Sequence, residues 1–182
     1  MWKLVAAGCM AIFLRAEVID RLAITVGRQS ITELQLDEEL RVTALLNVQP
    51  ISRTKEANRA TADRLVEQLL IRREMELSHY RGSASDDLAT YLGQVQSICG
   101  GTDRFQQLLH QYQLSEETVK EHLELQLAIL HFIEYRFRSD AVSATSSIEQ
   151  KIVEQQTDEA LAAWLEESRK QVSIVYIDKS LQ

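Results

Sequence analysis

Residues that interrupt helices are scarce in this chain, and their scarcity limits the fold more than any other feature. Proline occurs once, at position 50, and glycine occurs six times in 182 residues. Proline cannot continue a helix and glycine weakens one, so this composition favours helices joined by short connections. Hydrophobic residues at 45% and charged residues at 26% are ordinary values for a globular protein. We therefore expect one domain, over residues 17–182, with its own core.

Apolar residues recur with the helical period over most of positions 32–138. Thr32 opens this region, and its side chain can form a capping box with Gln35. Pro50 separates the first helix from the second. The periodicity predicts later helices over 55–80, 85–98, 102–112 and 116–138, and a last helix over 148–170, after a polar connector at 139–147.

Strand-forming segments lie at the two ends of this helical region. Residues 17–31 alternate apolar with smaller or polar side chains around Gly27, which predicts a β-hairpin. Residues 172–178 have the density of β-branched side chains that is typical of a strand. Because that strand has no partner nearby, we expect it to pair with the hairpin. The predicted fold class is mainly α with a small antiparallel sheet.

The first 16 residues have the features of a secretory signal peptide. Lys3 precedes an apolar run, and cleavage is expected between Ala16 and Glu17. The run is shorter than the roughly 20 apolar residues that a transmembrane helix needs. A buried N-terminal segment is one alternative, and lipidation at Cys9 is another. Cleavage would leave Cys99 as a single cysteine, which we expect to be buried and unreactive.

The charge of the chain disfavours two classes of partner. The formal net charge is −7, and loss of residues 1–16 leaves 18 basic against 27 acidic residues, a net charge of about −9. Nucleic-acid binding needs clustered Lys and Arg, and anionic membrane surfaces also attract basic segments. We therefore expect no nucleic-acid partner and no stable insertion into a membrane.

The sequence carries no recognisable catalytic or metal-binding motif. The four histidines, at positions 79, 110, 122 and 131, lack metal-ligand spacing, and we expect them at the surface. Gly100 and Gly101 lack the lysine of a phosphate-binding loop, and no nucleophile elbow is present. We therefore predict no metal, no cofactor and no enzymatic activity.

The order of the segments resembles SurA-type periplasmic chaperones. The segments that carry the resemblance are EVIDRLAITVGRQSITELQLDEEL, RLVEQLLIRREMEL, GTDRFQQLLHQYQLSEETVKEHLELQLAI and TDEALAAWLEESRKQVSIVYID, which together cover nearly all of residues 17–178. The resemblance implies a helical, peptide-binding domain like that of SurA and trigger factor. It also implies export to the periplasm and an ATP-independent holdase that binds unfolded outer-membrane protein precursors.

The chain departs from this family in two places. Family members commonly have glycine where this chain has Gln113, so we expect the turn before Ser115 to be made differently. The family's prolyl-isomerase domain would fall at residues 139–147, which are too few to form a domain. Prolyl-isomerase activity is therefore not expected.

A holdase would need exposed apolar and aromatic side chains to contact unfolded or partly folded polypeptides. The candidates are Met75, Tyr80, Phe132, Tyr135 and Phe137, although core packing explains the same apolar stripe. The alternative function is a helical scaffold that docks one folded partner or a second copy of itself, as a homo-oligomer.

Overall fold

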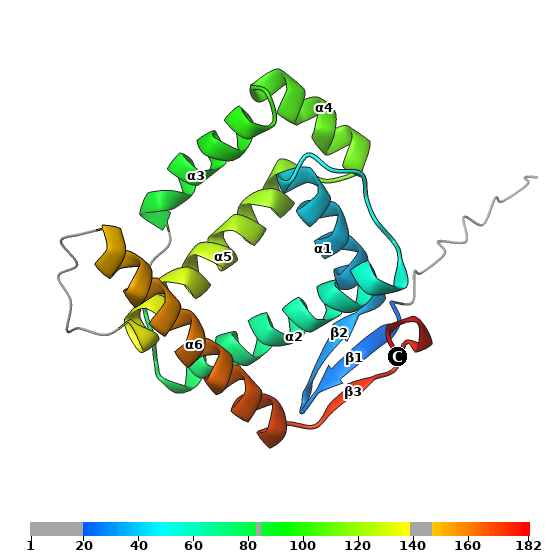
Figure 1. Ribbon diagram of the computed structural model, residues 1–182. Helices are drawn as coiled ribbons and strands as arrows, with labels where there is room; N and C mark the ends of the chain where they lie inside the picture. The colour runs from blue at the N-terminus through cyan, green and yellow to red at the C-terminus, as the bar shows by residue number, and fades with distance from the viewer. Residues whose placement is uncertain (1–19, 83–84, 139–146) are drawn as a thin grey trace, which may run out of the picture.

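The computed structural model describes residues 20–82, 85–138 and 147–182. The elements in chain order are β1 (Leu22–Val26), β2 (Gln29–Thr32), α1 (Glu33–Leu46), α2 (Lys55–Leu77), α3 (Ser85–Ile98), α4 (Thr102–Tyr112), α5 (Glu116–Phe137), α6 (Ser147–Gln171), β3 (Ile174–Tyr176) and a 3-10 helix, η1 (Lys179–Leu181). The mainly helical fold with a small sheet is confirmed (Figure 1). The predicted leader at 1–16, its cleavage site at Ala16 and Glu17, and the predicted connector as far as residue 146 lie outside the described residues.

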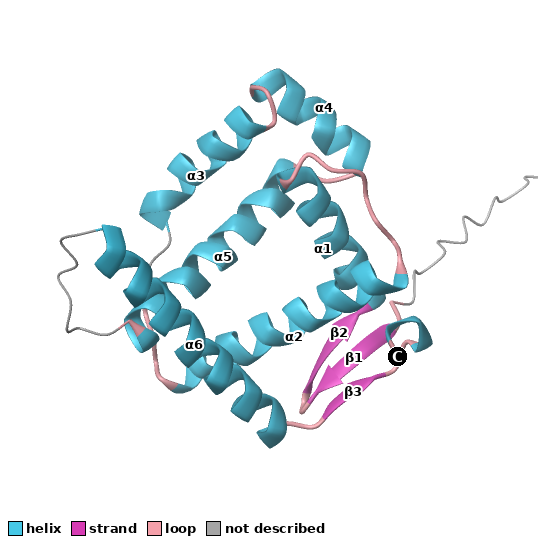
Figure 2. Ribbon diagram, viewed as in Figure 1, coloured by secondary structure: helices cyan, strands magenta, loops and turns pink. Residues whose placement is uncertain are grey.

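The two ends of the chain meet in one antiparallel sheet, as predicted. The strand order is β2-β1-β3, so β1 is central and β2 and β3 are edges (Figure 2). Gly27 and Arg28 form the turn of the hairpin, and Gly27 has a φ of 60°, which the first central position of a type II′ turn requires. The N–H of Gly27 donates to the carbonyl of Ser173 at 2.8 Å. This bond ties the hairpin turn to the segment that leads into β3.

The C-terminal strand is shorter than the predicted 172–178, because the chain turns away from the sheet. The carboxylate of Asp178 accepts a hydrogen bond from the Ser180 N–H at 2.8 Å and so caps η1, which the sequence analysis did not predict. Leu181 is then carried back into the core, where it is 1% exposed. The Arg59 guanidinium donates to the Leu181 carbonyl at 2.5 Å. The last residues are therefore anchored to α2.

Side-chain caps set the starts of several helices. Thr32 and Gln35 form the predicted capping box of α1, with bonds of 3.2 and 3.0 Å. The side chain of Thr54 caps α2 and that of Ser115 caps α5, each by accepting a hydrogen bond from a backbone N–H in the first turn. These side chains satisfy N–H groups that have no partner within the helix.

The second helix, α2, ends before residue 80, where the sequence predicted its end. The helix stops at Leu77, His79 takes a left-handed conformation with φ of 53°, and the Tyr80 N–H returns to the Met75 carbonyl at 3.0 Å. This is the bonding pattern of a Schellman motif. It turns the Tyr80 side chain back toward α5.

The turn between α4 and α5 corrects a second expectation. Gln113 has φ of 54° and ψ of 44°, the left-handed conformation that a glycine would adopt. Gln113 therefore adopts the backbone conformation that glycine prefers in such a turn. Because Gln113 has a side chain, this conformation costs about 1–2 kcal/mol of conformational free energy. The Arg41 guanidinium donates to the Gln113 carbonyl at 2.7 Å and helps to hold it.

Two buried clusters form most of the core. The helical-end core joins α1, α3, α4 and the start of α5, and consists of Ala44, Leu45, Val95, Cys99, Phe105, Leu108, Leu109, Tyr112, Val119 and Leu123. The sheet-end core joins the hairpin, α1, α2 and η1, and consists of Ala23, Ile24, Val26, Ile31, Leu36, Ala62, Val66, Leu70 and Leu181. In Figure 1, α3 and α4 lie at one end of the molecule and the sheet lies at the other, and α1 runs between them.

Candidate functional site

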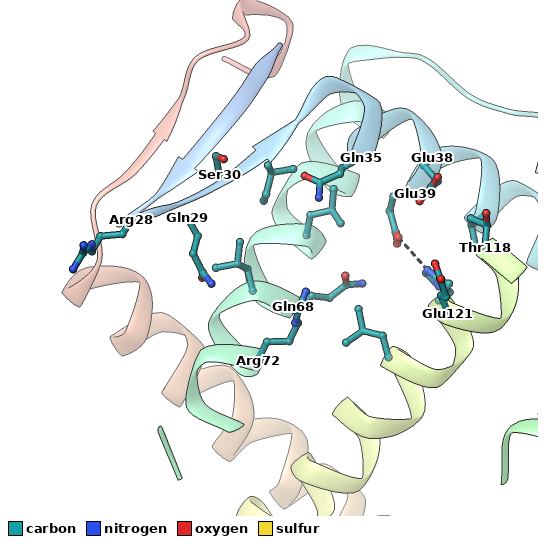
Figure 3. A pocket seen from close by; sticks show the side chains of 16 residues that line it. Arg28, Gln29, Ser30, Gln35, Glu38, Glu39, Gln68, Arg72, Thr118 and Glu121 are labelled. Atoms are coloured by element: carbon teal, nitrogen blue, oxygen red, sulfur yellow. Dashed lines mark ion pairs between the residues drawn. The ribbon is translucent and has the colours of Figure 1, made fainter. Parts of the chain in front are cut away.

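The candidate site is a cleft of about 460 Å³ between the hairpin and three helices (Figure 3). We name it the β2 cleft. Its lining comes from the hairpin turn and β2, from α1, from α2 and from α5, and consists of Arg28, Gln29, Ser30, Ile31, Gln35, Glu38, Glu39, Val42, Leu65, Gln68, Leu69, Arg72, Thr118, Glu121, His122 and Leu125. It therefore joins the sheet end of the molecule to its helices.

The cleft meets β2 at the edge of the strand. Four consecutive residues, 28–31, line the cleft. Successive side chains of a strand point to opposite faces, so a cavity that touches Gln29, Ser30 and Ile31 in a row approaches β2 along its edge. The edge position of β2 in the sheet agrees with this. The backbone of β2 is thus part of the wall.

A buried carboxylate joins three helices at one end of the cleft. Glu39, on α1, is 7% exposed. Its carboxylate lies 3.3 Å from Nδ1 of His122, on α5, and 3.8 Å from the guanidinium of Arg64, on α2. A carboxylate removed from water needs such partners, because an unpaired buried charge is costly. This pairing fixes the helices that frame the cleft.

His122 corrects the expectation that the histidines lie at the surface. Its side chain is mostly buried and faces Glu39. A sequence signal existed: Glu39 follows Leu36 by three residues and so falls on the apolar face of α1. A charged residue on an apolar helical face needs a partner, but its identity depends on the packing of α5.

The exposed charges of the cleft are separated by sign. Arg28 lies at the hairpin turn and Arg72 on α2, whereas Glu38 and Glu121 lie toward the start of α5 (Figure 3). All four side chains are exposed, and none forms an ion pair with another described residue. One end of the cleft is therefore basic and the other acidic.

Apolar side chains also line the cleft. Leu65 and Leu69, on α2, line the cleft and pack on the sheet-end core. Leu125, on α5, lines the cleft and packs on a third cluster of Ile71, Ile129 and Phe132. The cleft thus combines apolar contacts, backbone groups and charges of both signs.

The five residues predicted to bind clients gather around that third cluster, where α2, α5 and α6 meet. The Tyr80 ring lies 5.2 Å from the rings of both Phe132 and Tyr135, and Met75 packs on the same cluster. The Phe137 ring lies 5.8 Å from that of Trp164 on α6. The sequence therefore identified residues that the tertiary structure brings together.

Burial separates the roles of these five residues. Phe132 is 0% exposed, so it is a core residue rather than a surface contact, which corrects its inclusion among the client-binding candidates. Tyr135 is 70% exposed. Burial, with a smaller contribution from Glu134, raises the pKa of Tyr80, so its phenol stays neutral and can donate a hydrogen bond. Tyr135 is the most accessible aromatic candidate.

The described residues hold no group of three or more His, Cys, Asp or Glu side chains placed to bind a metal ion. Cys99 is buried, as predicted, and burial raises the pKa of its thiol, so the reactive thiolate is disfavoured. Among the helices in the described part of the chain, none has the length and apolar character that crossing a membrane requires.

Comparison with known proteins gives no family assignment. No model of a protein family matches the chain, and a search of curated proteins finds no significant match. The resemblance to SurA-type chaperones therefore stays a prediction from the sequence.

Proposed function

We propose that the chain is an ATP-independent holdase for unfolded or partly folded polypeptides, acting in the periplasm on clients such as outer-membrane protein precursors. The observation that carries the proposal is the β2 cleft, which offers apolar side chains, backbone groups and charges of both signs in one open depression. Such a mixed surface suits chains of varied sequence, because no single side chain is required.

The exposed aromatic surface beside Tyr135 supports the same proposal. An aromatic side chain that is mostly solvent-exposed retains most of its apolar area for an incoming chain. Leu125 contacts both the cleft and the cluster on which these aromatic residues pack. A client could therefore contact both surfaces at once.

The test is an aggregation assay on the purified chain. A urea-unfolded outer-membrane β-barrel protein is diluted into buffer, and light scattering is recorded with increasing amounts of the chain. We expect suppression at near-stoichiometric ratios. Tyr135→Ala should weaken it, whereas Tyr91→Ala, a matched change on α3, should not. Unchanged aggregation in the presence of folded protein would contradict the proposal.

A docking scaffold is the second candidate, and the edge strand β3 favours it. Val175, within β3, is 50% exposed, and Ile177, the residue that follows the strand, is 46% exposed. Exposed apolar edge strands can pair with a second chain. Light scattering that gives the mass of a stable dimer, together with no effect on client aggregation, would support the scaffold over the holdase.

A further inference from the structure

The backbone of β2 presents an unpaired edge to the cleft. β1 and β2 are joined by a two-residue turn, which places Val26 opposite Gln29 and Ile24 opposite Ile31. In such a hairpin the residues that flank the turn exchange backbone hydrogen bonds, and every second pair along the ladder does the same. Gln29 and Ile31 therefore bond to β1, and the N–H and carbonyl of Ser30 point away from the sheet.

The groups around Ser30 leave this edge open. Ser30 is exposed and forms no hydrogen bond to a described residue outside the sheet. The next outward-facing N–H, that of Thr32, is already used by the Gln35 side chain at 3.0 Å. The edge thus offers one complete residue for pairing, in a cleft that the apolar side chains of Leu65 and Leu69 also line.

The charges define what an added strand should carry. The basic side chain of Arg28 lies at the turn and that of Arg72 on α2, whereas the acidic side chains of Glu38 and Glu121 lie toward the start of α5. An extended segment that lies along β2 would pass both ends in turn. Complementarity favours an acidic residue near the turn and a basic residue near α5.

We propose that an extended segment of a client polypeptide adds to the free edge of β2 as a fourth strand of the sheet. Its backbone pairs with Ser30, its apolar side chains contact Leu65 and Leu69, and its two ends meet the opposite charges of the cleft. This inference rests on the proposed function and names the way in which that function is performed.

The length of the edge sets the strength of the contact. One outward-facing residue supplies two backbone hydrogen bonds, each worth about 0.5–1.5 kcal/mol. Backbone pairing reads no side chain, so many sequences fit. Binding by this route is weak and general, as a protein that must release its clients requires.

The first test uses backbone methylation to separate strand pairing from side-chain contact. The probe is a fluorescent octapeptide of alternating Val and Thr with Glu at one end and Lys at the other. Two methylated versions carry N-methyl groups at odd or at even positions. Since successive amides of a strand point in opposite directions, only one version should lose affinity, by about fivefold. Equal affinity for both would overturn the inference.

The second test reads the site directly. Binding of the unmethylated peptide should slow hydrogen exchange of the Ser30 amide, and leave that of Thr25 in the central strand unchanged. Arg72→Glu should weaken binding about threefold, and exchanging the Glu and Lys of the peptide should restore it. Arg73→Glu, an exposed neighbour on α2 outside the cleft, is the matched control. An unprotected Ser30 amide at saturation would overturn the inference.

The two proposals fail in different ways. Suppression of aggregation without peptide pairing at Ser30 would support the holdase proposal and overturn the proposal of a fourth strand. Pairing at Ser30 without suppression of aggregation would support the strand-pairing site and overturn the holdase proposal.

Discussion

The helical-end core and the sheet-end core are assembled from different parts of the chain. The helical-end core takes its members from residues 44–123, within one stretch of sequence. The sheet-end core combines residues 23–70 with Leu181 and also packs on half-buried residues of α6 and β3. The first core therefore draws only on an internal stretch of the chain, whereas the second requires the N-terminal hairpin and the C-terminal segment to meet.

Polar contacts at the sheet end hold the C-terminal segment against α2. The Tyr176 hydroxyl donates to the Asp63 carboxylate at 2.5 Å, and the Arg59 guanidinium lies 3.9 Å from the centre of the Tyr176 ring. Arg169, on α6, reaches Glu67 at 3.0 Å. These contacts join α2 to β3 and α6. The sheet end, which carries the β2 edge, therefore depends on the C-terminal segment.

Removal of residues 172–182 should have the largest effect. The truncated chain loses β3, η1 and the buried Leu181 side chain. We expect the free energy of unfolding to fall by more than about 5 kcal/mol, since a single buried Leu→Ala change costs about 2–5 kcal/mol. Urea denaturation measures the loss, and hydrogen exchange should rise in β1 while α4 keeps its protection. Equal loss at both ends would show that the two cores form one cooperative unit.

Phe105→Ala tests the other core. Phe105 is fully buried in the helical-end core, so its truncation should cost about 3–5 kcal/mol. At temperatures where the variant is folded, its affinity for the strand peptide should not change, because Phe105 belongs to the helical-end core and does not line the β2 cleft. Loss of peptide binding by a folded Phe105→Ala variant would contradict the separation of the two ends.

Tyr176→Phe should have a smaller effect that depends on pH. The variant loses the half-exposed hydrogen bond to Asp63, at a cost of about 1 kcal/mol near pH 8. Burial, together with that bond, raises the pKa of Tyr176 above its ordinary value of 10. The folded state therefore holds the phenolic proton more tightly, and the chain loses stability as pH rises above 10.

The control for this titration is Tyr91→Phe, which keeps the contacts of Tyr176. The free energy of unfolding of the unmodified chain should fall more steeply between pH 10 and 11 than that of Tyr176→Phe, and Tyr91→Phe should follow the unmodified chain. If the free energy of unfolding falls in parallel with pH for all three proteins, the pKa of Tyr176 does not differ between the folded and unfolded states.

Gln113→Gly should have the smallest effect, and it should stabilise the chain. Glycine adopts the left-handed conformation without strain but loses more entropy on folding, so we expect a gain of about 0.5–1 kcal/mol. Gln111→Gly, at an exposed position inside α4, should instead lower stability by a similar amount. Thermal unfolding of both variants measures the difference, and a destabilised Gln113→Gly would show that the side chain has a role of its own.

The sequence pointed to the aromatic cluster beside the candidate site, but not to the β2 cleft itself. The helical period selected the aromatic residues that gather near α6, because the period reports which side chains share a face. It could not separate Phe132, which is fully buried, from Tyr135, which is mostly exposed, because both lie on the same helix and burial depends on what packs against it. The β2 cleft was missed because its lining comes from four separate elements.

The sequence by itself determined the helices, the hairpin, the capping box at Thr32 and the pairing of the chain ends, since these follow from local periodicity, capping chemistry and the need of each strand for a partner. Only the tertiary structure decided that Glu39 meets His122 and that β2 keeps one edge open above a cleft. The physical reason is that contacts between distant segments depend on how whole elements pack, and a local pattern fixes the face of an element but not its neighbour.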